Sequence, residues 1–451
     1  MFATLIPLLV SSGDFPVPTA LPPHSWDTVG HKVFIHGCKR EGLFNASELQ
    51  LAAKFPLLTV EKGQGEDLPG YAEDKMNALA AQYHGARPDG WTLFCASFAT
   101  ALPARPPARL ERARVPRRPS TVPRHRAACS PPTLPRARAP PPSTPADINA
   151  KFNWNMYRLS ETVKSSPPAV TGGPLWVVNA SGQPCLSHGD RTFPQPAAGM
   201  LSFNHSNAAM RALWIQEIVN QTTTAAPTAA ASANDAAAGR FSGVFVDSAD
   251  CWAGAKGAAN GAKCGVGAAE VAALAAGERL VLTELQAALG PAKLVLAKDG
   301  GGDYNDTREV NTLFPSDAYC SSYRADVHSA ALAAACAGQI GAAVAAAGRG
   351  QAVLMHGEMN SDASAGSAQA QFEYALAAFL IAAGDSSFFG FSDGWYFNGT
   401  RWHEEYDRPL GAPRGPATVS GPDNMTYARQ FAHADVALDV ANHKASIAWG
   451  K

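Results

Sequence analysis

Residues 243–248 read GVFVDS, a small and apolar run that ends in an acid and a serine. An apolar run of this length is typical of a strand buried on both faces of a parallel sheet. Seven similar runs occur along the chain: VFIHG at 33–37, LLTVEK at 57–62, TLFCAS at 92–97, KLVLAK at 293–298, DAYCSS at 317–322, AVLMHGE at 352–358 and SFFGFS at 387–392. Together these runs predict eight strands.

Helical patterns fall between the strands, at 47–55, 208–219, 270–289, 329–347 and 368–383. Alternating strands and helices predict an α/β fold with a parallel sheet, and eight strands favour a closed (β/α)8 TIM barrel. An open doubly wound sheet is the alternative, although no GxGxxG motif follows the first strand. Two further runs, at 431–440 and 445–449, predict a small C-terminal β appendage.

Composition divides the chain into segments. Residues 103–145 hold 13 Pro and ten Arg, and such a stretch is expected to be disordered because it cannot pack a core. We therefore predict a disordered insertion at 102–146 and a barrel built from 26–101 and 147–425. A possible signal or N-terminal segment spans 1–25, and a C-terminal β hairpin spans 426–451.

Charge argues against nucleic acid as a partner. Without 103–145, the remaining chain has 27 Lys and Arg against 37 Asp and Glu, a net charge of −10. A nucleic-acid-binding protein needs a basic surface, so none is expected here. The Ala-rich stretches read as amphipathic helices, so no membrane span is expected, and the oligomeric state is left open.

Several features indicate a secreted protein or one in the lumen of the secretory pathway. The N-glycosylation pattern occurs seven times, at Asn45, Asn179, Asn204, Asn220, Asn305, Asn398 and Asn424. The apolar run from Phe2 to Val10 fits a short signal sequence, although no basic residue precedes it. Eight cysteines fit disulfides in that compartment, and we expect Cys251 to pair with Cys264 across a Gly/Ala-rich loop.

Polar residues gather where the predicted strands end, which is where (β/α)8 barrels carry their active sites. Asp247 directly follows a buried strand, and Glu358 ends a strand three places further on. Hydrolysis of a glycosidic bond needs two carboxyl groups on either side of the bond. We therefore predict Asp247 and Glu358 as catalytic residues, with Asp247 as nucleophile and Glu358 as acid/base. A loop acid and a structural ion pair are the respective alternatives, and the sequence does not distinguish retention from inversion.

The remaining polar and aromatic groups at the strand ends and in the nearby loops are predicted to contact substrate. They are His36, Glu61, Lys62, Trp154, Tyr157, Asp250, Lys298, Tyr319, His356, Asp393 and Trp395. Aromatic rings in such a set favour a sugar over a phosphate, because no phosphate-binding glycine loop is present. No HxH or HExxH spacing supports a metal, and no cofactor is expected.

Several blocks of sequence are similar to a known family. These blocks are VFIHGCKREGLFNASELQLAAKFPLLTVEKGQG at 33–65, NMYRLSE at 155–161, PLWVVNASGQPC at 174–185, GVFVDSADCW at 243–252, YALAAFLIAAGDSSFFGFSDGWY at 374–396, YDRPLGAPRGPA at 406–417 and YARQFAHADVALDV at 427–440. They resemble the TIM-barrel proteins of the hypothetical glycosyl-hydrolase-like family fifteen and its relatives. The resemblance implies a TIM barrel, a carbohydrate substrate and a strand-four acid at Asp247. The insertion departs from the pattern, because it interrupts an aromatic-rich loop that resumes at 151–159.

The sequence thus predicts a glycoside hydrolase. Two alternatives stay open: a non-catalytic carbohydrate-binding barrel, and a lyase or aldolase in which Lys62 or Lys298 forms a Schiff base.

Overall fold

A computed structural model shows how the predicted strands are arranged. It describes residues 17–22, 24–61, 63–65, 68, 72–97, 159, 173–183, 185–187, 200–223, 241–247, 249, 251–298, 309–315, 319–320, 329–358, 365–392, 397, 400–421 and 423–450. The predicted signal run, the insertion at 102–146 and six candidate contacts lie outside these residues. The six are Lys62, Trp154, Tyr157, Asp250, Asp393 and Trp395.

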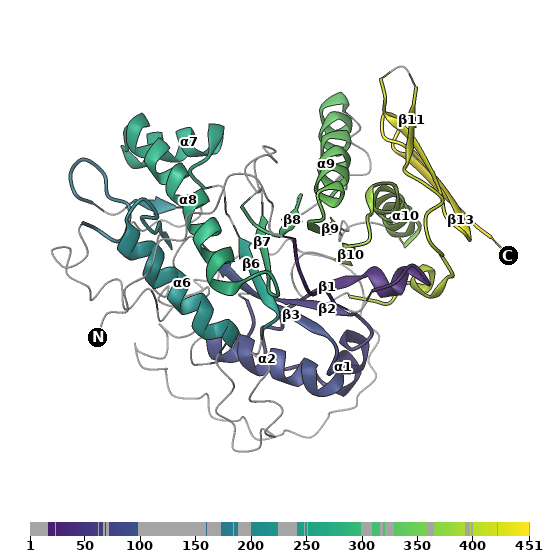
Figure 1. The fold of residues 1–451 in the computed structure, drawn as a ribbon, viewed down its shortest axis with the longest axis horizontal. Coiled ribbons are helices and arrows are strands. Elements are labelled where there is room, and N and C mark those ends of the chain that lie inside the picture. The colour runs from purple at the N-terminus through teal and green to yellow at the C-terminus, as the bar shows by residue number, and fades with distance from the viewer. Residues whose placement is uncertain are drawn as a thin grey trace, which may run out of the picture.

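Eight parallel strands form one sheet (Figure 1). In spatial order they are β1 (Phe34–Gly37), β2 (Leu57–Val60), β3 (Trp91–Ser97), β6 (Gly243–Asp247), β7 (Leu294–Lys298), β8 (Thr312–Phe314), β9 (Ala352–Glu358) and β10 (Ser387–Ser392). A parallel bridge between Val33 and Phe389 joins the first strand to the last. The sheet therefore closes on itself, which confirms the predicted (β/α)8 barrel.

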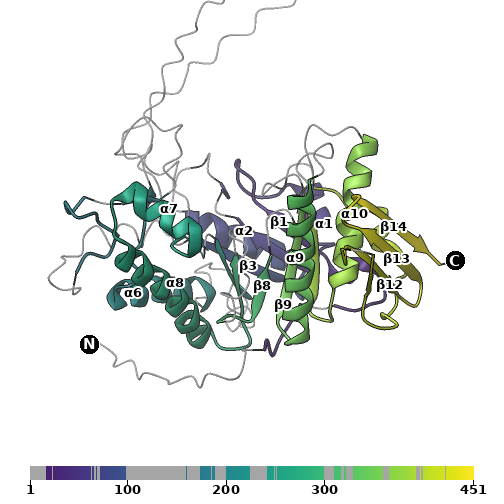
Figure 2. The same cartoon turned by 90° about the horizontal axis from the view of Figure 1, so that it is seen from above.

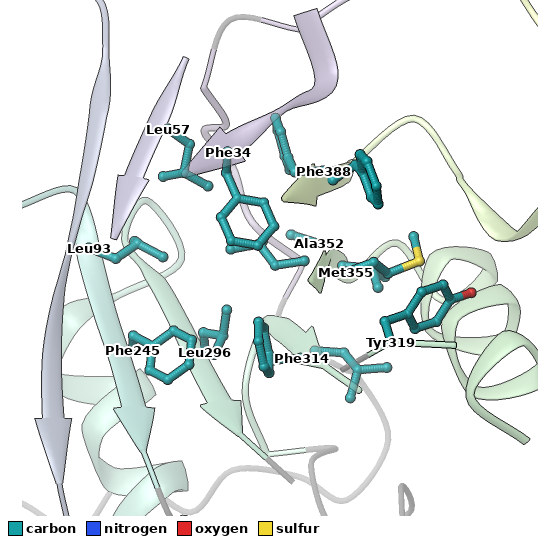
Figure 3. Packing of buried hydrophobic residues seen from close by; sticks show 14 of the residues in the cluster. Phe34, Leu57, Leu93, Phe245, Leu296, Phe314, Tyr319, Ala352, Met355 and Phe388 are labelled. Carbon is teal, nitrogen blue, oxygen red and sulfur yellow. The ribbon is translucent and has the colours of Figure 1, made fainter. Parts of the chain in front are cut away.

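Apolar side chains from all sides fill the interior of the barrel. Figure 3 shows Phe34, Leu93, Phe245 and Phe314 directed toward one another from different strands. The rings of Phe245 and Phe314 lie 5.0 Å apart with an edge-to-face geometry. Buried β6 and β7 carry Val and Leu on both faces, because helices cover the outside of the barrel.

Helices surround the barrel (Figure 2). They are α1 (Ala46–Ala52), α2 (Ala72–Ala86), α6 (Ala208–Thr223), α7 (Gly254–Cys264), α8 (Ala268–Leu289), α9 (Ala330–Gly348) and α10 (Ala365–Ala382). The start of α1 is a capping box: the side chain of Asn45 accepts from the backbone N–H of Glu48, whose carboxylate accepts from that of Asn45. In the described part of the chain, only α9 is long and apolar enough to cross a membrane. Its Cys336 and Ile340 are buried against the barrel core.

The C-terminus forms a separate antiparallel sheet, which confirms the predicted β appendage. It contains β11 (Thr418–Ser420), β12 (Thr426–Gln430), β13 (Ala434–Asp439) and β14 (Lys444–Trp449). Figure 1 shows this sheet beside α10. The guanidinium of Arg429 donates to the carbonyls of Leu380 and Ala383, at 2.9 and 2.6 Å, and so caps the end of α10. This contact fixes the sheet to the barrel.

Two local predictions were wrong. The sixth strand is Thr312–Phe314, which pairs with both β7 and β9, and the predicted run at 317–322 is not that strand. Residues 319 and 320 form a turn in which Cys320 has a φ of +50°, a value incompatible with a strand. The Gly/Ala-rich segment is helix α7 and not a loop.

The predicted disulfide was also wrong. Cys264 bonds to Cys185 instead of Cys251, and a second disulfide joins Cys320 to Cys336. Cys264 ends α7, and the helix carries it away from Cys251, which precedes its first turn. Two disulfides fit an oxidising compartment.

Candidate active site

An ion pair lies at the carboxyl ends of two neighbouring strands. Asp247 is the last residue of β6 and is 7% exposed, and Lys298 is the last residue of β7. The ammonium of Lys298 lies 2.9 Å from Oδ1 of Asp247. An opposite charge at this distance favours the ionised carboxylate. The ion pair therefore lies at the end of the strands where (β/α)8 barrels carry their active sites.

The ring of His36 shows which residues face the interior of the barrel. It lies 5.9 Å from Phe245 of β6, 6.1 Å from Phe314 of β8 and 4.5 Å from His356 of β9. These three strands are not hydrogen-bonded to β1, so the four rings meet inside the barrel. They form a layer beneath the carboxyl ends of the strands.

The alternation of side chains along a strand places both predicted catalytic acids above this layer. Asp247 follows Phe245 by two residues, and Glu358 follows His356 by two. Residues two apart on a strand share a face. The side chains of Asp247 and Glu358 therefore belong to the interior-facing set, one step nearer the carboxyl ends than His36.

A third acid is bound to the histidine layer. Glu61 directly follows β2 and is 4% exposed. Its Oε1 lies 3.1 Å from Nδ1 of His36, and Thr59 Oγ1 also contacts that nitrogen. The backbone N–H of Glu61 donates to the carbonyl of Gly37 at 3.3 Å. These contacts hold Glu61 at the end of β2, the strand next to β1.

Electrostatics keep His36 neutral. Burial, and then the positive charge of Lys298, hold the pKa of His36 well below its usual value. A neutral imidazole carries a single N–H. With that proton on Nδ1, His36 donates to the carboxylate of Glu61. The dependence of this pKa on Lys298 places the ion pair and the His36–Glu61 contact in one electrostatic cluster.

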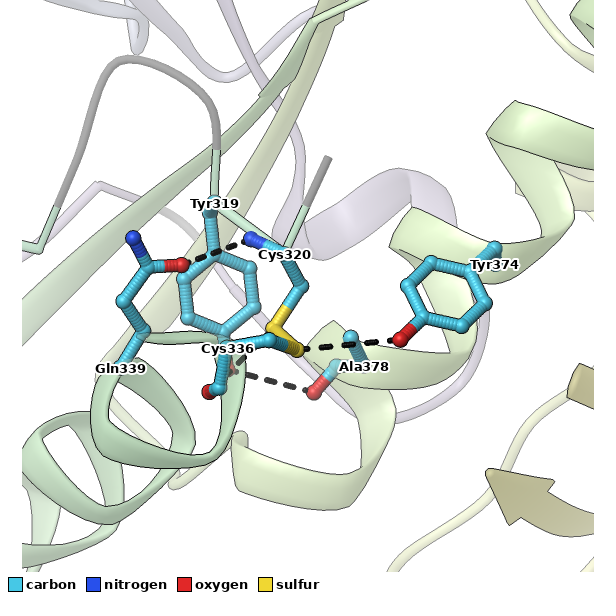
Figure 4. The surroundings of a disulfide bond; sticks show 6 residues. All are labelled: Tyr319, Cys320, Cys336, Gln339, Tyr374 and Ala378. Atoms are coloured by element: carbon cyan, nitrogen blue, oxygen red, sulfur yellow. Dashed lines mark hydrogen bonds between the residues drawn. A yellow bond between two sulfur atoms is a disulfide. The ribbon is translucent and has the colours of Figure 1, made fainter. Parts of the chain in front are cut away.

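The other two described candidates differ in their position. The imidazole Nε2 of His356 lies 2.9 Å from the hydroxyl of Ser392 on β10, within the interior. Tyr319 is fully buried, and its hydroxyl donates to the carbonyl of Ala378 on α10 at 3.4 Å. Figure 4 shows Tyr319 next to the Cys320–Cys336 disulfide, between α9 and α10. The structure therefore brings His36, Glu61, Asp247, Lys298, His356 and Glu358 to the interior of the barrel, and directs Tyr319 toward α10.

Two polar residues that contact the interior histidines were missed from the sequence: Thr59, which contacts His36, and Ser392, which contacts His356. Thr59 lies two residues before Glu61, and Ser392 pairs in register with Glu358 on β9. Because side chains alternate between the two faces of a strand, a residue two positions from a known interior residue also faces the interior, and this rule could have identified them. Among the described residues, no group of three or more His, Cys, Asp and Glu side chains is arranged to hold a metal ion.

Comparisons with known proteins give a family and a structural neighbour. The model of hypothetical glycosyl hydrolase family 15 matches residues 154–435, more than half of the chain. Among solved structures, a variant of the glycoside hydrolase domain of PelA from Pseudomonas aeruginosa is similar at 9% identity and a TM-score of 0.37. That alignment covers 82% of this chain and 96% of the other. No curated protein matches the chain.

Proposed function

Because the chain belongs to hypothetical glycosyl hydrolase family 15, we propose that it is a glycoside hydrolase with Asp247 and Glu358 as its catalytic carboxylates. The observation that carries the proposal is the ion pair of Asp247 with Lys298, 2.9 Å apart, at the carboxyl ends of β6 and β7. An ionised carboxylate in this position can attack an anomeric carbon or stabilise the positive charge that develops there.

The two carboxylates, Asp247 and Glu358, have different roles in the proposed reaction. Asp247 attacks the anomeric carbon as the nucleophile, and Glu358 in its acid form donates a proton to the departing glycosidic oxygen. Glu358 then removes a proton from the water that hydrolyses the glycosyl ester on Asp247. Each step conserves protons, since the one given to the leaving group is regained from water.

The remaining interior residues are proposed to bind the sugar. Glu61 and Lys298 present a carboxylate and an ammonium that can bond to hydroxyl groups, and His356 lies in the layer beneath them. Of the candidates outside the described residues, Lys62, Asp250 and Asp393 are proposed to bond to hydroxyl groups as well. Trp154, Tyr157 and Trp395 are proposed to stack on the sugar rings, and Tyr319 is the candidate with the least support because its hydroxyl is bonded to α10.

The state of Lys298 argues against the aldolase alternative for this residue. Schiff-base formation needs a neutral amine, which enzymes obtain by placing the lysine in an apolar site or beside another cation. Lys298 instead lies beside the carboxylate of Asp247, which favours the ammonium form. The other alternative, a non-catalytic barrel, would bind a sugar without hydrolysing it, and the assay described below distinguishes it from a hydrolase.

We further propose passage through a secretory pathway. The two disulfides support it, as do the exposed side chains of Asn45, Asn220 and Asn424, three of the asparagines in glycosylation patterns. The protein is expressed with and without a secretory route, and its mass is compared before and after enzymatic removal of N-glycans to test this assignment. A secreted protein of unmodified mass would contradict the glycosylation.

The catalytic assignment is tested by isosteric variants on a panel of glycans and aryl glycosides. Asp247→Asn and Glu358→Gln are expected to lower kcat on the order of 10³-fold or more, about 4 kcal/mol in the barrier. Asp435→Asn, an exposed acid on β13, is the matched control and is expected to keep full activity. Hydrolysis by Asp247→Asn at the wild-type rate would refute the assignment, and binding without any turnover by wild type would favour the non-catalytic barrel.

A further inference from the structure

The segment that follows Asp247 is held by two helices. Cys251 and Trp252, which lie between β6 and α7, are each 3% exposed. The carbonyl of Cys251 accepts from the side-chain amide of Asn260 on α7 at 2.7 Å. The backbone N–H of Trp252 donates to Oε2 of Glu278 on α8 at 3.0 Å. Both consecutive residues therefore have a main-chain group bonded to a side chain from a helix.

A glycine allows the segment to pack closely on α7. A Cβ added at Gly257 would lie 1.8 Å from the carbonyl oxygen of Trp252, a separation that no side chain can adopt. The first turn of α7 therefore approaches the backbone of Trp252 at a position where only glycine fits. This contact is independent of Glu278 and restrains the same residue.

Helix α7 is itself fixed at its far end. Cys264, its last residue, forms the disulfide with Cys185. A small apolar cluster lies between the helix, the segment and α8, separate from the main core. Its members are Val177, Cys185, Cys251, Trp252, Val266 and Leu274. The segment after Asp247 is thus one side of a second packed unit.

The presence of an acid at position 278 requires an explanation. Glu278 is 2% exposed and lies on the face of α8 that also buries Leu274, Val281 and Leu282. Burial of a carboxylate is unfavourable unless hydrogen bonds compensate for the loss of water. A bond from a backbone N–H to a carboxylate is charge-assisted and stronger than one to a neutral acceptor. The contact with Trp252 is such a bond.

We propose that Glu278 is a positioning residue that fixes the β6–α7 segment and, through it, the carboxylate of Asp247. Trp252 is only five residues from Asp247, so movement of the segment changes the backbone from which Asp247 projects. The effect on hydrolysis rests on the proposed function of Asp247. The restraint on Trp252 does not, and it is measured separately.

Hydrogen exchange of the full-length protein tests the restraint. Glu278→Met keeps the volume of the side chain and removes the acceptor, whereas Glu278→Gln keeps an oxygen that can accept. We expect exchange of the Trp252 amide to be at least tenfold faster in Glu278→Met and close to wild type in Glu278→Gln. The control is Glu284→Met on the same helix, which breaks the 2.9 Å contact with Arg211 and is expected to leave Trp252 unchanged.

A second variant keeps the test decisive if Glu278→Met does not fold. Gly257→Ala leaves Glu278 in place but displaces the carbonyl of Trp252, so it is also expected to accelerate exchange of that amide. Unchanged exchange in Glu278→Met would overturn the proposal; if that variant does not fold, unchanged exchange in Gly257→Ala would overturn it, because displacing Trp252 would then not affect the amide that Glu278 is proposed to hold. Equal acceleration in Glu284→Met would also overturn it, because the effect would then be a general loss of stability.

Kinetics on the best glycan of the panel test the link to Asp247. Glu278→Met is expected to lower kcat by about 10- to 100-fold with KM within about twofold, and Glu278→Gln to recover most of that loss. A wild-type kcat in Glu278→Met, with faster exchange at Trp252, would overturn the role in positioning Asp247. If wild type hydrolyses no glycan, the proposed function fails, while exchange at Trp252 still decides whether Glu278 fixes the segment.

Discussion

The ammonium of Lys298 lies 2.9 Å from the carboxylate of Asp247, and the two residues end neighbouring parallel strands. Their side chains are 18% and 9% exposed, so water screens the pair only weakly. Lys298 also contributes to the lowered pKa of His36 in the layer beneath. The charge of one lysine therefore acts both on the proposed nucleophile and on the histidine that contacts Glu61.

Loss of Lys298 is expected to destabilise the fold. In Lys298→Met the carboxylate of Asp247 stays in a poorly hydrated site without this cation, and breaking such a pair costs about 3 kcal/mol. Urea denaturation at pH 7 measures the change. The double variant Asp247→Asn/Lys298→Met is expected to recover most of the loss, because it leaves no unpaired charge. A double variant less stable than Lys298→Met would contradict this account.

Three of the buried histidines, His36, His205 and His403, are expected to make the protein sensitive to acid. Burial lowers the pKa of His205 to about 3 and that of His403 to about 4, and His36 is shifted in the same direction. The unfolded chain, with a pKa near 6.5, binds more protons than the native state below that pH. The stability contributed by each group is therefore complete above pH 6.5 and is lost as the pH falls toward the folded pKa.

The size of this effect follows from the number of groups. Each histidine contributes a slope of about 1.4 kcal/mol per pH unit, so the three together give about 4 kcal/mol per unit below pH 6. Urea denaturation between pH 7 and 5 measures it. His403→Gln is expected to reduce the slope by about a third, and an unchanged slope in that variant would show that His403 is already protonated in the native state.

Most of the barrel was predictable because each buried strand is a separate apolar run. The sixth strand was misplaced because DAYCSS contains Tyr and Cys, while Thr312–Phe314 is only three residues long. Pairing of Thr312 with both Leu296 and Ala352 identifies the strand, and that pairing is tertiary. Helix α7 was missed because Gly and Ala also occur in loops, and its packing and the Cys185–Cys264 disulfide are long-range features.

The polar residues at the carboxyl ends of the strands were predictable once the strands themselves had been predicted. The rule that barrel active sites lie at the carboxyl ends of strands identifies Asp247, Lys298 and Glu358 once the strands are known. The direction of Tyr319 was not predictable, because it depends on where β8 ends. Glu278 was missed because an acid in the middle of a helix normally faces water, and its contact with Trp252 joins residues that are 26 positions apart.

Lys32 is expected to make the protein more stable at alkaline pH. It is fully buried, and its pKa is lowered to about 7. Burial is the largest cause; the negative charge of Asp385 raises the pKa in part, and the positive charge of Arg429 lowers it. In the unfolded chain the pKa is near 10.5. A lowered pKa means that the stability from this group is complete above pH 10.5 and is lost as the pH falls toward 7.

Lys32→Met tests this expectation. Between pH 7.5 and 9.5 wild type should gain about 1.4 kcal/mol of stability per pH unit from Lys32, and the variant should lack that gain. Thermal unfolding across this range measures the difference. The variant also loses the bonds that Lys32 donates to the carbonyls of Gly384 and Asp385, so the slope with pH and not the stability at one pH is the readout. Equal slopes would show that Lys32 stays protonated in the native state.

The two disulfides are expected to stabilise the protein to different extents. Cys185–Cys264 closes a separation of 79 residues and Cys320–Cys336 one of 16. From loop-closure entropy, the first contributes about 4.5 kcal/mol and the second about 3 kcal/mol. Urea denaturation of Cys185→Ala/Cys264→Ala and of Cys320→Ala/Cys336→Ala measures each, with reduced wild type expected to lose close to their sum. A smaller loss for the first pair than for the second would mean that the unfolded chain already keeps α7 close to Cys185.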